Sequence, residues 1–157
     1  MKNKEVKAFV MDVDGTLTDG SICISESGEL FKQFHVRDGY GIKNILSEHN
    51  IIPIVITGRY SDIVYIRCKE LGIQEVIQGS DDKLAELESI LDKYGIALSE
   101  AAYIGDDLND LKCIEKVGIS GCPNDAISEV KEFVTYICNC NGGHGAVREF
   151  IDWIISA

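Results

Sequence analysis

Acidic side chains stand where two short apolar segments end. Asp12 and Asp14 directly follow the apolar run at residues 6–11. Asp106 and Asp107 follow a second apolar run at residues 101–104. Four carboxylates that meet at one place repel one another unless a cation lies between them. Carboxylate oxygens, together with water and phosphate, suit Mg²⁺. The spacing therefore predicts a magnesium site where two strands end.

The first acidic pair can divide the chemistry of ester hydrolysis. Asp12 and Asp14 are two residues apart in an extended segment, so both side chains can reach the same side. One carboxylate can attack phosphorus to give an aspartyl-phosphate, while the other protonates the leaving alcohol and later activates water. Gly15 allows close approach of the backbone to a phosphate. The plainer alternative is a turn that ends a strand, since Asp and Gly are common in such turns.

Three further groups favour the chemical interpretation. Thr57 and Gly58 follow a third apolar run and offer a hydroxyl and free amides to a phosphate oxygen. Lys83 stands at the start of an expected helix, where the helix dipole already favours anions. Asp110 offers further metal ligation or orientation. A lone lysine is more often an ordinary solvated side chain, so the case for Lys83 depends on its position between the other motifs.

The elements that must position these groups alternate along the chain. Apolar runs predict strands, and apolar residues at helical spacing predict helices. Strands are expected at residues 6–11, 51–56, 76–77, 101–104 and 118–120, and helices at 41–48, 61–71, 82–94, 109–117 and 146–155. Ser61 is expected as an N-cap and Gly95 as a C-terminal glycine. Such alternation implies an α/β fold, a Rossmann-like three-layer sandwich with a mostly parallel sheet.

One segment departs from this alternation. Residues 21–25, a turn at 26–29 and residues 30–36 predict a β-hairpin, which forms a small flap after the first strand. The 157 residues fall within the usual size of one domain, so residues 1–157 are expected to form a single domain.

The composition limits the partners and the location. Fifteen Lys and Arg against 26 Asp and Glu give a formal net charge of −11, which excludes the basic surface of a nucleic-acid binder. No apolar stretch approaches the ~20 residues that span a membrane, and residues 1–5 lead into a strand-like segment without a secretory signal. The six cysteines are expected to be reduced, and the pair Cys138 and Cys140 lacks the second ligand pair of a zinc site. A cytoplasmic location follows.

Four motifs, in this order, resemble those of the haloacid dehalogenase-like phosphatases. They are Asp12-Val13-Asp14-Gly15-Thr16, Thr57-Gly58-Arg59, Lys83 and Gly105-Asp106-Asp107-x-x-Asp110. The resemblance implies that Asp12 is the nucleophile and Asp14 the general acid/base, while Thr57 and Lys83 hold the phosphoryl group. It places Mg²⁺ on Asp12, the Asp14 carbonyl and Asp106, with Asp107 and Asp110 supporting. The gaps between the motifs leave no room for a cap domain.

Further segments resemble one capless subfamily, the 3-deoxy-D-manno-octulosonate 8-phosphate phosphatases. They are residues 18–20, residues 35–42 and the glycine-rich tail at 142–149. The resemblance implies a homotetramer in which hairpins and tails close the sites of neighbouring subunits. It also carries over these substrate contacts: Asp14, His35, Arg37, Asp38, Gly39, Lys43, Gly58, Arg59, Arg67 and Lys83.

Departures from that subfamily leave alternatives open. Lys43 stands where Arg is usual, His35 where Asn is usual, and His144 where Arg is usual in the tail. A Lys in place of an Arg loses bidentate geometry. A nine-carbon acid 9-phosphate, from sialic acid or its deaminated analogue, is therefore an alternative substrate. A non-catalytic regulatory subunit and phosphonate or haloacid chemistry are further alternatives, although Asp14 suits an alcohol leaving group that needs a proton.

Overall fold

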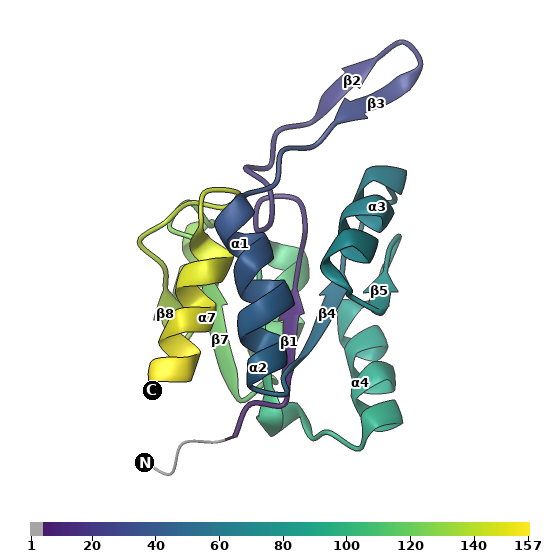
Figure 1. The fold of residues 1–157 in the computed structure, drawn as a ribbon. Helices are drawn as coiled ribbons and strands as arrows, with labels where there is room; N and C mark the ends of the chain where they lie inside the picture. The colour runs from purple at the N-terminus through teal and green to yellow at the C-terminus, as the bar shows by residue number, and fades with distance from the viewer. Residues whose placement is uncertain (1–4) are drawn as a thin grey trace.

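The centre of the fold is a six-stranded sheet in the order β5-β4-β1-β6-β7-β8, in which every pair of neighbours is parallel. Its strands are β1 (Ala8–Met11), β4 (Ile52–Ile56), β5 (Glu75–Ile77), β6 (Ala101–Ile104), β7 (Ile119–Cys122) and β8 (Tyr136–Ile137). The fold comes from a computed structural model that describes residues 5–157 (Figure 1). Residues 1–4, on which part of the N-terminal expectation rests, lie outside the described residues.

Strand β1 illustrates why the apolar segments of this chain form a parallel sheet. Its four residues are fully buried. Phe9 and Met11 join the apolar core on one face, while Ala8 and Val10 join the core on the other. A parallel sheet buried on both faces requires such continuous apolar strands. Because the chain passes to β4 on one side of β1 and later to β6 on the other, the strand order reverses at β1.

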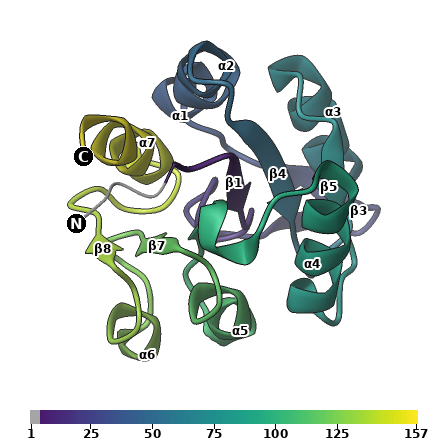
Figure 2. The same ribbon diagram turned by 90° about the horizontal axis from the view of Figure 1, so that it is seen from below.

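Helices cover both faces of the sheet, as the view along the strands shows (Figure 2). One face carries α1 (Val36–Tyr40), η1 (Gly41–Ile45), α2 (Leu46–Glu48), α3 (Asp62–Leu71) and α7 (Ala146–Ser156). The other carries α4 (Lys83–Tyr94), α5 (Leu111–Ile114) and α6 (Ser128–Lys131). Two short turns of 3-10 helix, η2 (Leu98–Glu100) and η3 (Leu108–Asp110), precede β6 and α5. The expected three-layer α/β fold without a cap domain is confirmed.

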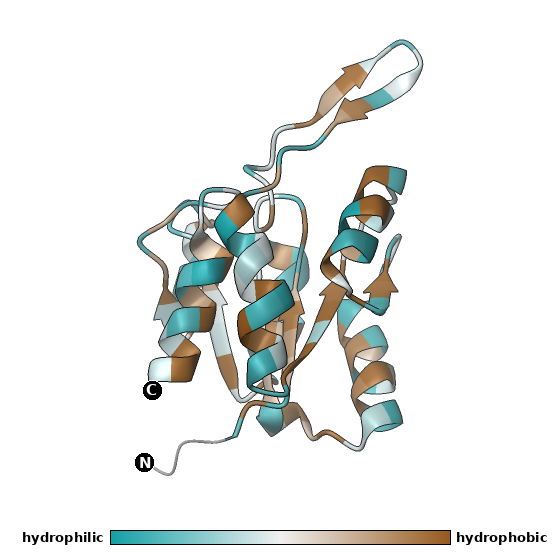
Figure 3. Cartoon of the chain, in the orientation of Figure 1, coloured by the Kyte–Doolittle hydropathy of each residue, from teal (hydrophilic) through white to brown (hydrophobic). Residues whose placement is uncertain are grey.

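The hairpin consists of β2 (Cys23–Ser25) and β3 (Gly28–Phe31), which pair antiparallel and project beyond the sandwich (Figure 1). Both of its strands include hydrophobic residues, drawn in brown in Figure 3. The expectation that its second strand continues to residue 36 is wrong. The chain turns into α1 at Val36, because His35 forms an N-cap whose Nδ1 accepts from the Arg37 amide. The helical segment therefore begins five residues before the expected position at 41.

Smaller differences have local reasons. The helix expected at 109–117 is a 3-10 turn followed by the single turn of α5. Strand β8 has only two residues and α6 only four, too short for a periodic pattern. Ser61 does stand at the N-cap of α3, but its side chain makes no capping hydrogen bond. Gly95 ends α4 with a φ of 65°, as expected. Within residues 5–157, none of the helices has the length and apolar character needed to cross a membrane.

Candidate active site

Polar side chains gather where the central strands end, at the edge of the sheet where the strand order reverses. Asp12 directly follows β1, Thr57 follows β4, and Asp106 follows β6 after one glycine. Asp12 is 5% exposed and Thr57 2% exposed. Open α/β sheets bind ligands at this carboxyl edge, beside the strand at which the order switches. The structure thus brings together three motifs that lie far apart in the sequence.

Lys83 connects two of the carboxylates. Its Nζ lies 2.9 Å from Asp12 Oδ1 and 2.8 Å from Asp110 Oδ1, and its side chain is 2% exposed. Asp82 caps the start of α4 by accepting from the Ala85 amide, which fixes Lys83 as the first residue of that helix. Burial alone would lower the pKa of Lys83, but the charges of Asp12 and Asp110 outweigh it and raise the pKa. Lys83 is therefore a fixed cation beside Asp12.

Asp110 is held by donors on both of its oxygens. Besides Lys83, Oδ1 accepts a hydrogen bond of 2.6 Å from the Tyr103 hydroxyl. Oδ2 accepts from the Asp106 and Asp107 amides at 3.0 Å and 3.2 Å. A Cβ on Gly105 would lie 2.4 Å from the Asp110 carboxyl carbon, so only glycine fits there. With both oxygens engaged by protein donors, Asp110 acts as an anchor for Lys83 and for the loop that carries Asp106.

Asp106 faces the first motif. Thr16 Oγ1 donates to Asp106 Oδ1 at 2.9 Å. A Cβ on Gly15 would lie 2.1 Å from Asp106 Oδ2, and Gly15 has a φ of 91°, so glycine is required on both grounds. Asp107 is exposed and caps the η3 turn by accepting from the Leu108 amide at 2.7 Å.

The donor set fits a magnesium ion. Ligand atoms of Asp12, Asp106 and Asp110 lie within 4.8 Å of one another. Burial and repulsion from Asp110 raise the pKa of Asp12 to about 6, although Lys83 opposes this. Burial and repulsion from Asp12 and Asp110 raise the pKa of Asp106 to about 8. A divalent cation held by Asp12 and Asp106 would remove this repulsion, and hard carboxylate oxygens are the ligands that Mg²⁺ prefers.

Asp14 lies at the base of the hairpin. Its Oδ1 is 2.6 Å from the Nζ of Lys32, and its side chain is 19% exposed. Asp14 is thus more accessible than Asp12, whose side chain is 7% exposed.

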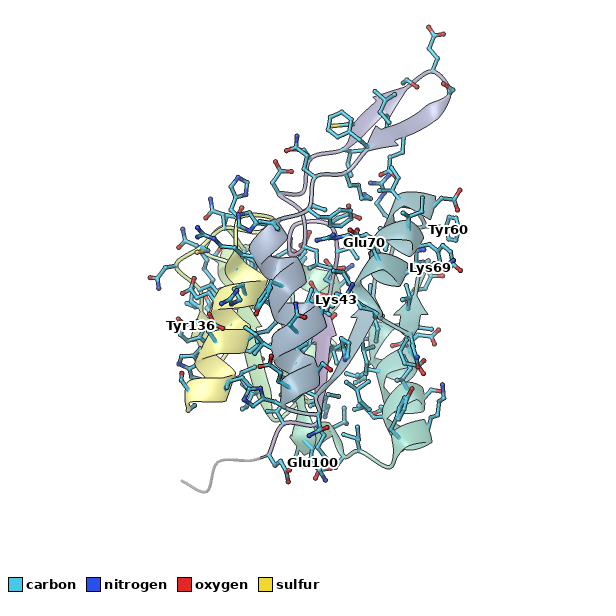
Figure 4. All side chains as sticks on the ribbon, viewed as in Figure 1. Lys43, Tyr60, Lys69, Glu70, Glu100 and Tyr136 are labelled. Carbon is cyan, nitrogen blue, oxygen red and sulfur yellow. The ribbon has the colours of Figure 1, made fainter. Side chains whose placement is uncertain are left out.

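The predicted substrate-contact residues differ in their exposure and in the elements on which they lie. Gly58 and Arg59 are exposed just beyond Thr57, and Arg37 is exposed in the first turn of α1. Lys43 lies about two turns further along the same helical segment. It donates to the Glu70 carbonyl of α3 at 3.1 Å (Figure 4).

His35, Asp38, Gly39 and Arg67 surround a small cavity beneath the start of α1. Asp38 is 2% exposed and accepts from the Arg148 amide of α7 at 2.9 Å. Arg67 pairs with Glu70 at 2.8 Å and lies over the Phe34 ring. Their contact with a substrate remains a prediction.

The glycine-rich tail packs on the first motif of its own chain. The Gly143 amide donates to the Thr16 carbonyl at 3.1 Å. A Cβ on Gly142 would lie 1.9 Å from the Gly15 carbonyl oxygen. Glu149 holds this segment by accepting from the Asn139 and Cys140 amides. The tail therefore supports the loop that carries Asp12 and Asp14.

Sequence reasoning missed three residues of the site. Thr16 belongs to the first motif, but the pattern gives it no role, although its hydroxyl lies beside Asp106. Tyr103 stands in an apolar strand, where nothing in the pattern indicates that its hydroxyl binds Asp110. Lys32 is one of many lysines, and only its place in the hairpin so close to the first motif could have drawn notice.

The parallel sheet carries a buried carboxylate–lysine centre at its carboxyl edge, an arrangement that suits an α/β enzyme with an anionic substrate. The haloacid dehalogenase-like hydrolase family matches residues 55–151. The chain belongs to this family.

Known proteins resemble the chain over nearly its whole length. The 3-deoxy-D-manno-octulosonate 8-phosphate phosphatase KdsC of Salmonella typhi is 42% identical, with 99% of this chain and 82% of that protein covered. The same-named protein of Haemophilus influenzae is 38% identical, with 99% and 86% covered.

One similar solved structure is that of the 3-deoxy-D-manno-octulosonate 8-phosphate phosphatase from Moraxella catarrhalis, in complex with magnesium, phosphate and KDO. It is 44% identical in sequence and superposes with a TM-score of 0.94, and the superposition covers 99% of this chain and 88% of the Moraxella chain. The cobalt-bound phosphatase of Haemophilus influenzae superposes equally, with a TM-score of 0.94 at 38% identity, covering 99% of this chain and 91% of that one.

Proposed function

We propose that the protein is a magnesium-dependent phosphatase that hydrolyses 3-deoxy-D-manno-octulosonate 8-phosphate through an aspartyl-phosphate on Asp12. The observation that carries the proposal is the buried centre in which Lys83 holds Asp12 at 2.9 Å beside Asp106. Such a centre combines a fixed nucleophile with a cation and a metal-binding carboxylate. The substrate follows from relatives of that name at 42% identity and from the related structure that contains KDO.

The first half of the reaction transfers the phosphoryl group to the protein. A carboxylate oxygen of Asp12 forms a bond to phosphorus while the bond from phosphorus to the sugar oxygen breaks. Asp14 gives its proton to that leaving oxygen, which therefore departs as a neutral hydroxyl group of the sugar acid. Lys83 keeps Asp12 oriented and offsets the negative charge of the incoming phosphate.

The second half restores the enzyme. Asp14, now a carboxylate, takes a proton from a water molecule, and the water oxygen bonds to phosphorus as the Asp12–phosphorus bond breaks. Inorganic phosphate leaves, and Asp14 is again protonated. The Thr57 hydroxyl and the Gly58 amide stand at the carboxyl end of β4, where they can hold phosphate oxygens through both halves.

Asp12, Asp106 and the Asp14 carbonyl would hold the magnesium ion. Bound there, Mg²⁺ offsets the charge of the phosphoryl group and aligns it with the nucleophile.

Phosphate release from a panel of eight- and nine-carbon acid phosphates tests the substrate. With Mg²⁺ present, we expect the highest kcat/KM for the octulosonate 8-phosphate. If the 9-phosphate of sialic acid or of its deaminated analogue is preferred, the nine-carbon alternative replaces this assignment. If none exceeds a generic aryl phosphate, the sugar-acid assignment fails.

Asp12→Asn tests the nucleophile. The amide cannot form the aspartyl-phosphate, so kcat for any phosphate ester should fall at least about 10³-fold. Circular dichroism should show an intact fold, since Lys83 retains Asp110 as a partner. Substantial remaining turnover would contradict the role of Asp12.

We further propose a homotetramer in the cytoplasm. Ile22, Ile24, Leu30 and Phe31 of the hairpin region are between 44% and 66% exposed, and burial against other subunits would remove these side chains from water. All six cysteines are free, which suits a reducing compartment. Light scattering and cell fractionation test the two statements.

A further inference from the structure

Lys32 differs from the rest of the hairpin. It directly follows β3, where Phe31 is 47% exposed, yet the side chain of Lys32 is only 2% exposed. Its Nζ lies 2.6 Å from Asp14 Oδ1 and 2.8 Å from Glu29 Oε1. The hairpin thus places a buried cation directly on the carboxylate that exchanges protons in the proposed reaction.

A second contact fixes this cation from the other side. Glu29 accepts a hydrogen bond from the Ser61 hydroxyl, which belongs to the loop after β4. The Ser61 amide in turn donates to the Gln78 side chain at 2.9 Å. A continuous series of contacts therefore runs from the loop after β4, through Glu29 and Lys32 of the hairpin, to Asp14.

The geometry has a consequence for Asp14. A carboxylate has two oxygens, and Lys32 occupies Oδ1 with a short, charge-assisted contact. Such a contact fixes the rotation of the carboxylate and directs the exchangeable proton to the other oxygen. Proton transfer is effective only when the acid is held within hydrogen-bond reach of the leaving oxygen. A freely rotating Asp14 would satisfy that condition for only part of the time.

We infer that Lys32 is a positioning residue of the hydrolytic reaction: it orients Asp14 for proton transfer to the leaving oxygen and makes the hairpin part of the reactive unit. The inference rests on the proposed function and concerns one step of it. A lysine that only anchored the hairpin would affect all substrates alike. A lysine that orients the acid affects most strongly those esters whose leaving oxygen needs a proton.

Two aryl phosphates of similar shape separate these roles. p-Nitrophenyl phosphate releases a stable anion that needs little protonation, whereas phenyl phosphate releases a more basic oxygen. In Lys32→Met, which keeps an apolar stem but loses the charge, kcat/KM for phenyl phosphate should fall about tenfold or more. The value for p-nitrophenyl phosphate should stay within about threefold, with KM little changed for either.

Matched variants complete the experiment. Lys32→Arg keeps a cation and should restore part of the loss on phenyl phosphate. Glu29→Gln removes the second carboxylate partner and should give a smaller loss with the same dependence on the leaving group. Gln33→Ala changes the exposed neighbour and should behave as the unmodified protein does.

Equal losses on the two esters, or no loss, would overturn the inference while leaving the proposed function in place. An unmodified protein that hydrolyses neither ester nor the sugar-acid phosphate would overturn the proposed function, and the role of Lys32 with it.

Discussion

Asp12, which is buried, and Asp106, which is partly buried, are two neighbouring acids of raised pKa. Their pKa values of about 6 and about 8 lie above those of carboxyls in an unfolded chain, because burial and mutual repulsion disfavour the charged forms. The metal-free folded protein therefore binds more protons than the unfolded chain between about pH 4 and pH 8. These two groups therefore contribute to the free energy of unfolding below about pH 4, and this contribution is lost as the pH rises to about 8.

Magnesium binding should reverse this dependence. Because the ion must displace the protons of Asp12 and Asp106, its affinity should increase as the pH rises from 6 to 9. Thermal melting at several pH values, in excess Mg²⁺ and in EDTA, measures the effect. The difference in Tm between the two conditions should widen with pH, and Asp106→Asn should narrow it. A difference in Tm that is constant with pH would contradict the assignment of the ion to these carboxylates.

We predict that substitution of Asp110 lowers the stability of the fold. It accepts from Lys83, Tyr103 and two backbone amides inside the protein. Asp110→Asn leaves Lys83 with a single carboxylate partner in a buried setting, so the free energy of unfolding should fall by about 3 kcal/mol.

Urea denaturation measures this change, and Asp92→Asn on the exposed face of α4 is its control. The control should stay within about 0.5 kcal/mol of the unmodified protein. An equal stability of the two variants would mean that Asp110 is not the anchor of the site.

At the scale of residues, the sequence predicts the groups that stand at the ends of strands, but not the contacts between loops. Asp12, Thr57 and Asp106 end buried strands, and parallel strands bring their ends together, so the grouping could be predicted. The binding of Lys83 by Asp110 and of Asp14 by Lys32 could not, because these contacts depend on how loops from separate elements meet. The spacing of residues along the chain does not indicate which loops come into contact.

At the scale of elements, long apolar runs and marked helix ends were predictable, while short elements were not. β1, β4 and β6 are continuous apolar runs, and α4 has both an N-cap and a C-terminal glycine. In contrast, residues 30–36 contain apolar side chains that suit a strand, yet the backbone turns into α1 at His35. The two-residue strand β8 exists because β7 offers it a parallel partner, which only the tertiary structure supplies.

The glycine-rich tail gives the clearest prediction at this scale. A Cβ on Gly142 would lie 1.9 Å from the Gly15 carbonyl oxygen, so Gly142→Ala must push the tail and the loop of Asp12 and Asp14 apart. Displacement of a reacting group by about 1 Å can lower the rate about 10²-fold. We therefore expect kcat/KM for a phosphate ester to fall by that order.

Gly72→Ala is the matched control for this substitution. Gly72 has a positive φ of 75°, which strains an alanine there, but nothing lies within 4 Å of its added Cβ. This variant should lose about 1 kcal/mol of stability and keep its kcat/KM. If both variants keep full activity, the tail does not support the first motif.

At the scale of the whole molecule, the hairpin is the feature that a single chain leaves unexplained. Ile24 and Leu30 are 66% and 58% exposed on an arm that projects from the sandwich (Figure 3). If burial between subunits holds the tetramer, the double change Ile24→Asp and Leu30→Asp should dissociate it, because charged side chains resist burial. Light scattering should then report a lower mass for the double variant. Glu26→Gln, at the exposed turn of the hairpin, is the control and should keep the mass of the unmodified protein. Leu30 lies between Glu29 and Lys32 in the sequence, and Ile24 is paired with Glu29 in the hairpin, so dissociation should also lower kcat/KM. A monomeric unmodified protein, or an unchanged mass in the double variant, would contradict the role of the hairpin in assembly.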